Sequence, residues 1–382
     1  MKRKILAAAI LATAVGSLAV AQELKNNNGP QQQINPNLNL NNINPAILAP
    51  PDHDPAMNNP DQTNWQLFVQ VVTPALSQGN NNAAFETWAS DEDTFKANAT
   101  FPTALTPKVL KVPALIRLAP RKRGLQPHVT VGGTEEVRRN NASFDFIVNN
   151  KLNTVSGLKA AFTAKKPISF PVDSIEVKAN WKPVTPGLNT SLYHINTASD
   201  GKQYALVSMH IISKMVPNWT WATFEHKDNV GRCDFMGCRD SFGATVAVVA
   251  PKTPTGGSYP ACDKTPALKA MFAKANLPAE YDNYCLNGSQ VDFITSTGLT
   301  TLLGNSVTED GFVSTSSCMT CHSQAAVTSM GASAFQNGGV TAQGSPNGAP
   351  LASWFWNNPG KSNQTQKNLQ MDFVWAIPLN AQ

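Results

Sequence analysis

The sequence predicts an α+β protein in which helices flank an antiparallel β-sheet. Apolar and polar residues alternate strictly over Ile175–Lys182, which is typical of a strand with one buried face. Earlier in the chain, four apolar residues recur at helical spacing: Trp65, Phe68, Val69 and Val72. The segments between the predicted strands are short, which favours antiparallel pairing.

The first part of the chain is expected to be mainly helix and loop. Asp61 or Thr63 can cap the helix that carries this apolar face, and Pro74 ends it. A short second helix is expected around residues 85–88, and a third over 152–162. The glycine inside the third segment weakens its helical pattern.

Three more strands are expected after Ile175–Lys182, namely Tyr204–Ile212, Trp219–His226 and Ala244–Val249. In the first of these, the apolar residues predicted to share one face are Ala205, Val207, Met209 and Ile211. His210 is expected on the opposite face, because successive side chains of a strand alternate.

The N-terminus has the features of a secretory signal peptide. A basic start at residues 2–4 precedes an apolar stretch at 5–15 that is too short to span a bilayer. Small residues at 19–21 then mark a cleavage point. The product is expected to be exported to the periplasm and not to span the membrane.

Charge excludes one class of partner. The chain has a net charge of +5, and removal of residues 1–21 takes away three positive charges, which leaves +5 − 3 = +2. Nucleic acid is therefore not an expected partner, because it requires concentrated basic charge.

Residues 318–322 have the sequence Cys-Met-Thr-Cys-His, the pattern that attaches a c-type haem. Thiols at this spacing lie about one helical turn apart, so each can form a thioether with one vinyl group of the same porphyrin. His322 can then bind the iron as the proximal ligand. A C-x-x-C pair also occurs in redox and zinc sites, but the adjacent histidine and the export signal favour haem. One haem c, held by Cys318 and Cys321, is the expected cofactor.

The chain is expected to have four regions: a signal peptide at 1–21, a disordered Asn/Pro-rich arm at 22–60, a mainly helical and loop region at 61–170, and the sheet with a C-terminal haem-binding region at 171–382. The arm is assigned from its composition, which cannot bury enough apolar surface to offset the entropy of ordering it.

Four further cysteines remain: Cys233, Cys238, Cys262 and Cys285. An even number in an oxidising compartment predicts two disulfides. Sequence allows three pairings, of which Cys233–Cys238 with Cys262–Cys285 is favoured because each closes a local loop. A zinc site with four cysteine ligands is the alternative.

The second ligand of the iron decides the function, since a strong ligand makes an electron carrier and an open position admits a small molecule. His210 and His226 are the first candidates, as distal ligands or as acid–base groups. Met371, 371 − 322 = 49 residues after His322, is another. It also fits an alternating apolar run, which would make it a core residue.

At Cys318–His322 the chain resembles the c-type cytochromes. The resemblance covers these five residues and the export signal, and it implies a periplasmic monohaem protein that passes single electrons to other redox proteins. In small helical cytochromes the motif lies early in the domain, whereas here it lies late in a partly β chain, as in some β-rich haem enzymes that oxidise nitrogen compounds. The alternatives are a haem-dependent oxidoreductase acting on a peroxide or nitrogen oxide, and a haem-based gas-binding protein.

Overall fold

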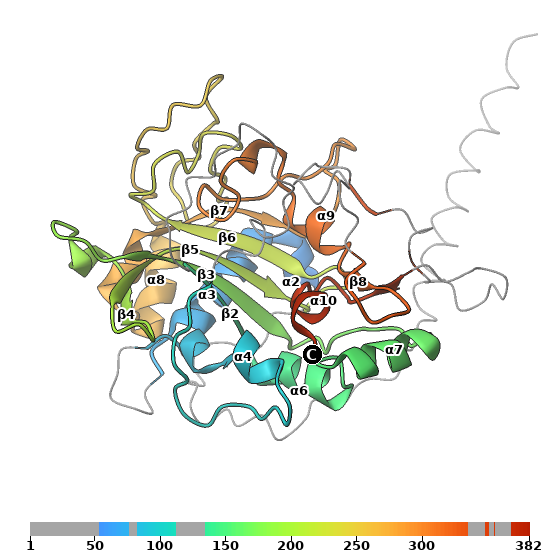
Figure 1. The fold of residues 1–382 in the computed structure, drawn as a ribbon. Helices are drawn as coiled ribbons and strands as arrows, with labels where there is room; N and C mark the ends of the chain where they lie inside the picture. Colours follow the sequence, from blue (N-terminus) through green and yellow to red (C-terminus); the bar gives the residue numbers. More distant parts are fainter. Residues whose placement is uncertain (1–52, 76–81, 112–133, 335–347, 351–354, 356–367) are drawn as a thin grey trace, which may run out of the picture. The chain divides into compact units, whose positions relative to one another are not determined.

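The computed structural model describes residues 53–75, 82–111, 134–334, 348–350, 355 and 368–382 (Figure 1). All of them belong to the unit Asn42–Gln382. The predicted signal peptide lies outside the described residues, as does the predicted disordered arm up to residue 52. The last part of that arm is not disordered, because His53–Asn58 form a helix in which Ala56 is buried. Of the helices in the described ranges, none is long and apolar enough to cross a membrane.

The α+β prediction is confirmed by a seven-stranded antiparallel sheet of order β1-β2-β3-β5-β6-β7, with β4 paired to β5. Its strands are β1 Ala89–Ser90, β2 Glu135–Arg139, β3 Ile175–Pro183, β4 Ile195–Thr197, β5 Gln203–Ser213, β6 Thr220–His226 and β7 Tyr284–Gln290. A second, two-stranded sheet pairs β8 Ala326–Val327 with β9 Leu369–Gln370.

Helices flank both faces of the large sheet. The α-helices are α2 His53–Asn58, α3 Pro60–Val72, α4 Asp91–Thr94, α6 Asn141–Asn149, α7 Val155–Thr163, α8 Pro266–Ala275, α9 Cys318–His322 and α10 Ala376–Asn380. The 3₁₀-helices are η3 Ala84–Thr87, η4 Thr190–Leu192, η5 Ala279–Asn283 and η6 Val313–Thr315. The three predicted helices therefore correspond to α3, η3 and α7.

The predicted cap of the first helix is wrong. Helix α3 begins at Pro60 after Asn59, which makes no side-chain cap hydrogen bond. The carboxylate of Asp61 instead accepts hydrogen bonds from Ser241, at 2.7 Å from its backbone N–H and 2.6 Å from its hydroxyl. This contact ties the start of α3 to a loop far along the chain.

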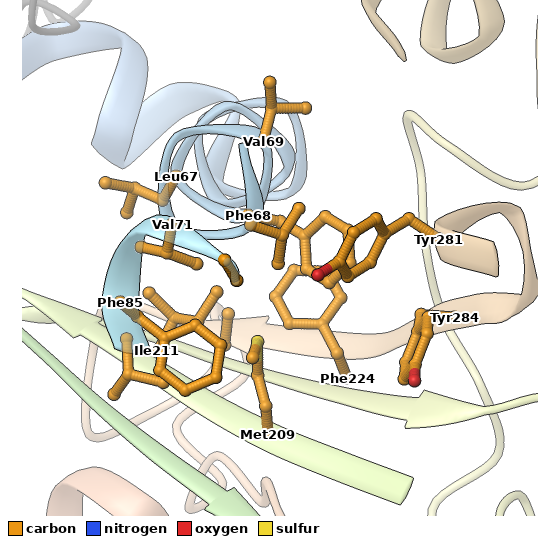
Figure 2. Packing of buried hydrophobic residues seen from close by; sticks show 14 of the residues in the cluster. Leu67, Phe68, Val69, Val71, Phe85, Met209, Ile211, Phe224, Tyr281 and Tyr284 are labelled. Atoms are coloured by element: carbon orange, nitrogen blue, oxygen red, sulfur yellow. The ribbon is translucent and has the colours of Figure 1, made fainter. Parts of the chain in front are cut away.

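One face of the sheet packs against α3 and α8. Phe68 of α3 lies at the centre of this core, with its ring 4.6 Å from that of Phe224 on β6 (Figure 2). Met209 and Ile211 of β5 belong to the same buried cluster. Complete burial of these side chains contributes roughly 1.5–3 kcal/mol each, so this layer is a major source of stability.

The predicted face of β5 is wrong in its first half, because the strand contains a β-bulge. Asn180 pairs with Ser208 and Trp181 pairs with Leu206, so β5 has one extra residue at Val207. Tyr204 and Leu206 consequently join Met209 and Ile211 in the α3 core. His210 still lies on the opposite face, as the alternation predicts.

One further strand expectation is wrong, and strands β1, β2, β4 and β7 were not expected. Residues 244–249 form no strand and make only isolated bridges, at Ala244 and Val248; Val246 and Val249 are 74% and 82% exposed. Strand β2 was missed because its sequence, Glu-Glu-Val-Arg-Arg, has no apolar alternation. Through β2, the region 61–170, which was expected to be mainly helix and loop, contributes to the same sheet.

The favoured pairing of the four cysteines is confirmed. Disulfides join Cys233 to Cys238 and Cys262 to Cys285, with Cα–Cα distances of 5.2 and 5.7 Å.

Candidate functional site

The predicted attachment segment forms the short helix α9, Cys318–His322. Gln290, the last residue of β7, accepts a hydrogen bond at 3.1 Å from the backbone N–H of Met319. The backbone N–H of Cys321 donates to the carbonyl of Ser317 at 2.9 Å. The helix is therefore fixed to the end of the sheet, and its two thiols lie on successive turns.

The ring of His322 is held by one of its two nitrogens. Because a carbonyl can only accept, Nδ1–H donates to the carbonyl of Phe373 at 2.8 Å. The other nitrogen, Nε2, has no hydrogen-bond partner among the described residues. Burial lowers the pKa of His322 to about 3, so the ring is neutral at neutral pH and Nε2 carries a free lone pair.

The carbonyl that holds His322 belongs to a strained turn. Asp372 and Phe373 have φ angles of 46° and 72°, in the left-handed region that non-glycine residues seldom adopt. The Asp372 carboxylate pairs with Lys214 at 2.7 Å and accepts the backbone N–H of Phe170 at 2.7 Å. Lys214 follows directly after β5, so the sheet holds the turn that orients His322.

Both cysteines of α9 are unpaired thiols. Cys318 is buried, and its Sγ lies 3.3 Å from the carbonyl of Leu303. Cys321 is half-buried, and its carbonyl accepts a hydrogen bond from Nε1 of Trp375 at 3.1 Å. Burial raises the pKa of both thiols, that of Cys321 to about 11, so both are protonated at neutral pH.

Cys318, Cys321 and His322 line one cavity together with His210 of β5. The volume of this α9 cavity is about 120 Å³. Parts of α4, β2, β3, β6 and α10 complete its wall.

Six carboxylates line the α9 cavity, and each has a cationic or histidine partner within ion-pair distance. The pairs are Asp91 and Glu176 with Arg139, Glu92 with Lys111, Glu135 with Lys178, Glu136 with Lys108 and Arg138, and Glu309 with His210. Each carboxylate of the wall therefore has a partner within the protein.

His210 contacts this wall through Nε2, which lies 3.2 Å from Oε1 of Glu309 and 3.2 Å from Nδ2 of Asn305. The carboxylate of Glu309 can only accept and the Nδ2 amide of Asn305 can only donate, so these two contacts require different states of Nε2 and do not fix the tautomer of the ring. Nδ1 is a buried nitrogen with no hydrogen-bond partner in the described part of the chain. Leaving such an atom unpaired costs about 1–3 kcal/mol, so a ligand at Nδ1 would be stabilising.

Four groups in the α9 cavity can thus bind a cofactor: the two thiols, Nε2 of His322 and Nδ1 of His210. They do not converge on one point. No three His, Cys, Asp or Glu side chains within the described ranges lie close enough together to hold a metal ion. The set suits an extended group with a central metal and reactive substituents better than it suits a bare ion.

The other two candidate ligands lie elsewhere. His226 is buried on the opposite face of the sheet, where its ring stacks on Tyr193 at 3.7 Å. Its Nε2 lies 2.9 Å from the carbonyl of Leu192, and its Nδ1 accepts the backbone N–H of Asp228 at 3.2 Å. Met371 is fully buried in an apolar cluster. Neither residue lines the α9 cavity, whereas His210 does.

Sequence reasoning missed Asn305 and Glu309, which hold His210. Both lie in the irregular segment between β7 and η6, and neither belongs to a recognisable spacing. It also missed Lys178, a polar residue of the alternating strand β3 that lines the α9 cavity. Only the pairing of distant segments brings these residues to the motif.

His226 makes a prediction of its own, because burial lowers its pKa from 6.5 to about 4. Its neutral form stabilises the fold above pH 6.5, and this contribution is lost as the pH falls towards 4, because the unfolded chain binds the proton first. His226→Phe keeps a ring against Tyr193. Between pH 7 and pH 4.5 this variant is expected to lose about 2–3 kcal/mol less stability than the wild type. Urea unfolding at both pH values measures the difference, and equal losses would contradict the prediction.

Comparisons with models of known protein families, with curated proteins and with solved structures found no match. What the α9 cavity binds is therefore inferred from its own side chains.

Proposed function

We propose that this protein is a periplasmic monohaem c-type cytochrome that carries single electrons to and from periplasmic redox proteins. The observation that carries the proposal is the α9 cavity, which the thiols of Cys318 and Cys321 line together with the rings of His322 and His210. The two thiols would hold the haem, and Nε2 of His322 would bind the iron. The bound haem would supply a one-electron redox centre.

The hydrogen bonding of His322 supports its role as proximal ligand. A histidine that binds a metal usually donates its second ring N–H to a carbonyl or carboxylate, which fixes the tautomer and the ring orientation. The Nδ1–H of His322 donates to Phe373 in this way. The neighbouring ring of Trp221, 4.7 Å away, limits rotation of the imidazole.

His210 is the proposed second ligand. Its Nε2 faces the carboxylate of Glu309, and its Nδ1 has no partner within the described residues. The pattern matches that of His322, with one nitrogen held and the other free. If His322 and His210 both bound the iron, the haem would transfer electrons without binding small molecules. The two disulfides and the predicted signal peptide support a periplasmic location.

A spectrum of the purified exported protein tests the proposal. The absorption of haem is expected to stay with the chain after denaturation and solvent extraction, and the native reduced spectrum should be low-spin and indifferent to carbon monoxide. His210→Ala is expected to make the iron accessible to carbon monoxide, while the matched control His226→Ala leaves it closed. A purified protein without covalent haem would overturn the proposal.

A second candidate function is a haem-dependent oxidoreductase that acts on a small molecule such as a peroxide or a nitrogen oxide. The opening of the α9 cavity to solvent favours it. In that case Nδ1 of His210, backed by Glu309, would accept a proton from the substrate. Binding of carbon monoxide by the wild-type protein would select this function over electron transfer.

A further inference from the structure

In the described part of the chain, two buried cations have no carboxylate within ion-pair distance. Arg232 and Lys264 are 5% and 6% exposed, and within the described ranges neither makes an ion pair. By contrast, the equally buried Lys108, Arg138 and Arg139 all pair with carboxylates. Burial lowers the pKa of the Arg232 guanidinium, and it lowers that of Lys264 to about 8; nearby carboxylates, Glu225 for Arg232 and Asp240 for Lys264, act in the opposite direction.

Each of these cations touches a disulfide. Nη1 of Arg232 lies 3.2 Å from Sγ of Cys233 and 3.1 Å from Sγ of Cys238. Nζ of Lys264 lies 2.8 Å from Sγ of Cys262. A neutral disulfide sulfur is a weak acceptor and compensates little of a buried positive charge.

Reduction would change this balance. A thiol beside a cation is deprotonated more readily, so the reduced form would give each cation the anionic partner that it lacks. A sulfur that leaves as a stabilised thiolate also leaves faster during exchange. Arg232 contacts both sulfurs of its disulfide, so it can stabilise whichever sulfur departs.

A small second cavity gives access to this disulfide. Its volume is about 70 Å³, and it is lined by Arg232 and Cys238 and also by Cys262 of the other disulfide. Cys238 is 7% exposed, whereas Cys233 is fully buried. The sulfur within reach is therefore that of Cys238, and the available space suits a small molecule.

We propose that Cys233–Cys238 is a thiol–disulfide exchange site for small aliphatic thiols, with Arg232 as the residue that stabilises the leaving thiolate. An external thiolate attacks Sγ of Cys238, the Cys233–Cys238 bond breaks, and Cys233 leaves as a thiolate beside Arg232. A second external thiolate attacks the external sulfur of the mixed disulfide, which releases the sulfur of Cys238 and forms the external disulfide. Two electrons pass from two external thiols to the protein.

A redox titration of the full-length protein tests the proposal. Wild type, Arg232→Met and Arg232→Lys are equilibrated with graded ratios of reduced to oxidised dithiothreitol. Free thiols are then alkylated and quantified for each cysteine by mass spectrometry, and circular dichroism checks the fold. Arg232→Met is expected to require a roughly tenfold or higher ratio to reduce Cys233–Cys238, and Arg232→Lys is expected to stay near the wild type.

Lys264→Met is the matched control, since it removes the other unpaired cation and should leave the Cys233–Cys238 midpoint unchanged. The proposal is overturned if Arg232→Met titrates like the wild type, or if this disulfide is reduced only when the fold is lost. The rate at which Cys233–Cys238 is reduced is then measured with 2-mercaptoethanol and with a reduced dithiol protein. The comparison distinguishes a small thiol from a protein thiol as the reductant. Faster reduction by the dithiol protein would overturn the assignment to small thiols.

Discussion

A Cys318→Ser/Cys321→Ser variant is expected to be exported and folded but to carry no covalent haem. Serine hydroxyls do not form the thioether bonds that hold the porphyrin, while their size lets α9 keep its place at the end of β7. The absorption of haem in denatured, solvent-extracted protein is expected to fall to background. Each single variant keeps one thiol and should retain a partial, single-bonded fraction.

The matched control is Cys233→Ser/Cys238→Ser, which removes the same number of sulfurs at a site outside the α9 cavity. This control is expected to retain its haem in full. Covalent haem in the Cys318→Ser/Cys321→Ser protein would contradict the role of these thiols, and loss of haem in both proteins would show an effect of general misfolding.

Lys214→Met is expected to destabilise the protein by about 3–5 kcal/mol, because it leaves a buried carboxylate without its cation. Lys214 and Asp372 are 2.7 Å apart, and their side chains are only 9% and 8% exposed. Chemical denaturation measures the loss. The control Lys202→Met removes an exposed partner of Asp200, at 3.9 Å, and is expected to cost less than about 1 kcal/mol.

The same pair has a second expected readout, in the proposed haem-bound protein. Asp372→Asn tolerates the left-handed backbone and keeps an acceptor for Phe170, but it removes the charge that holds Lys214. If the turn orients His322 through Phe373, this variant should shift the midpoint potential of the haem as well as the stability. A loss of stability with an unchanged potential would show that the turn is only structural.

The sheet was predictable only in part, because β7, with Tyr284 and Leu286 in the core, was not predicted, and the strand predicted at 244–249 does not form. Strands β3, β5 and β6 were found at nearly their observed bounds, because alternation with a period of two is visible in the sequence. Strand β2 was not visible, because Glu135–Arg139 is buried through ion pairs with distant residues such as Asp91 and Lys178. A charged strand is distinguishable from a charged loop only when its partners are known.

The candidate site was likewise predictable only in part. Cys318–His322 could be read from the sequence because its chemistry lies within five consecutive residues. The choice between His210 and His226 could not be made, since both lie on predicted strands. The structure pairs His210 with Thr223, three residues before His226, so the two rings point to opposite faces of the sheet. The register between the two strands decides which histidine faces the α9 cavity, and the sequence of either strand alone does not determine that register.

The order of the elements along the chain has a consequence for assembly. All seven strands of the large sheet precede residue 291, and α9 begins at Cys318. Because the chain is synthesised from its N-terminus, most of the cavity wall is present before the two thiols appear. Helix α10, which also lines the α9 cavity, follows last. Haem attachment would thus take place before the wall of the α9 cavity is complete. Docking of the C-terminal residues would then enclose the bound cofactor.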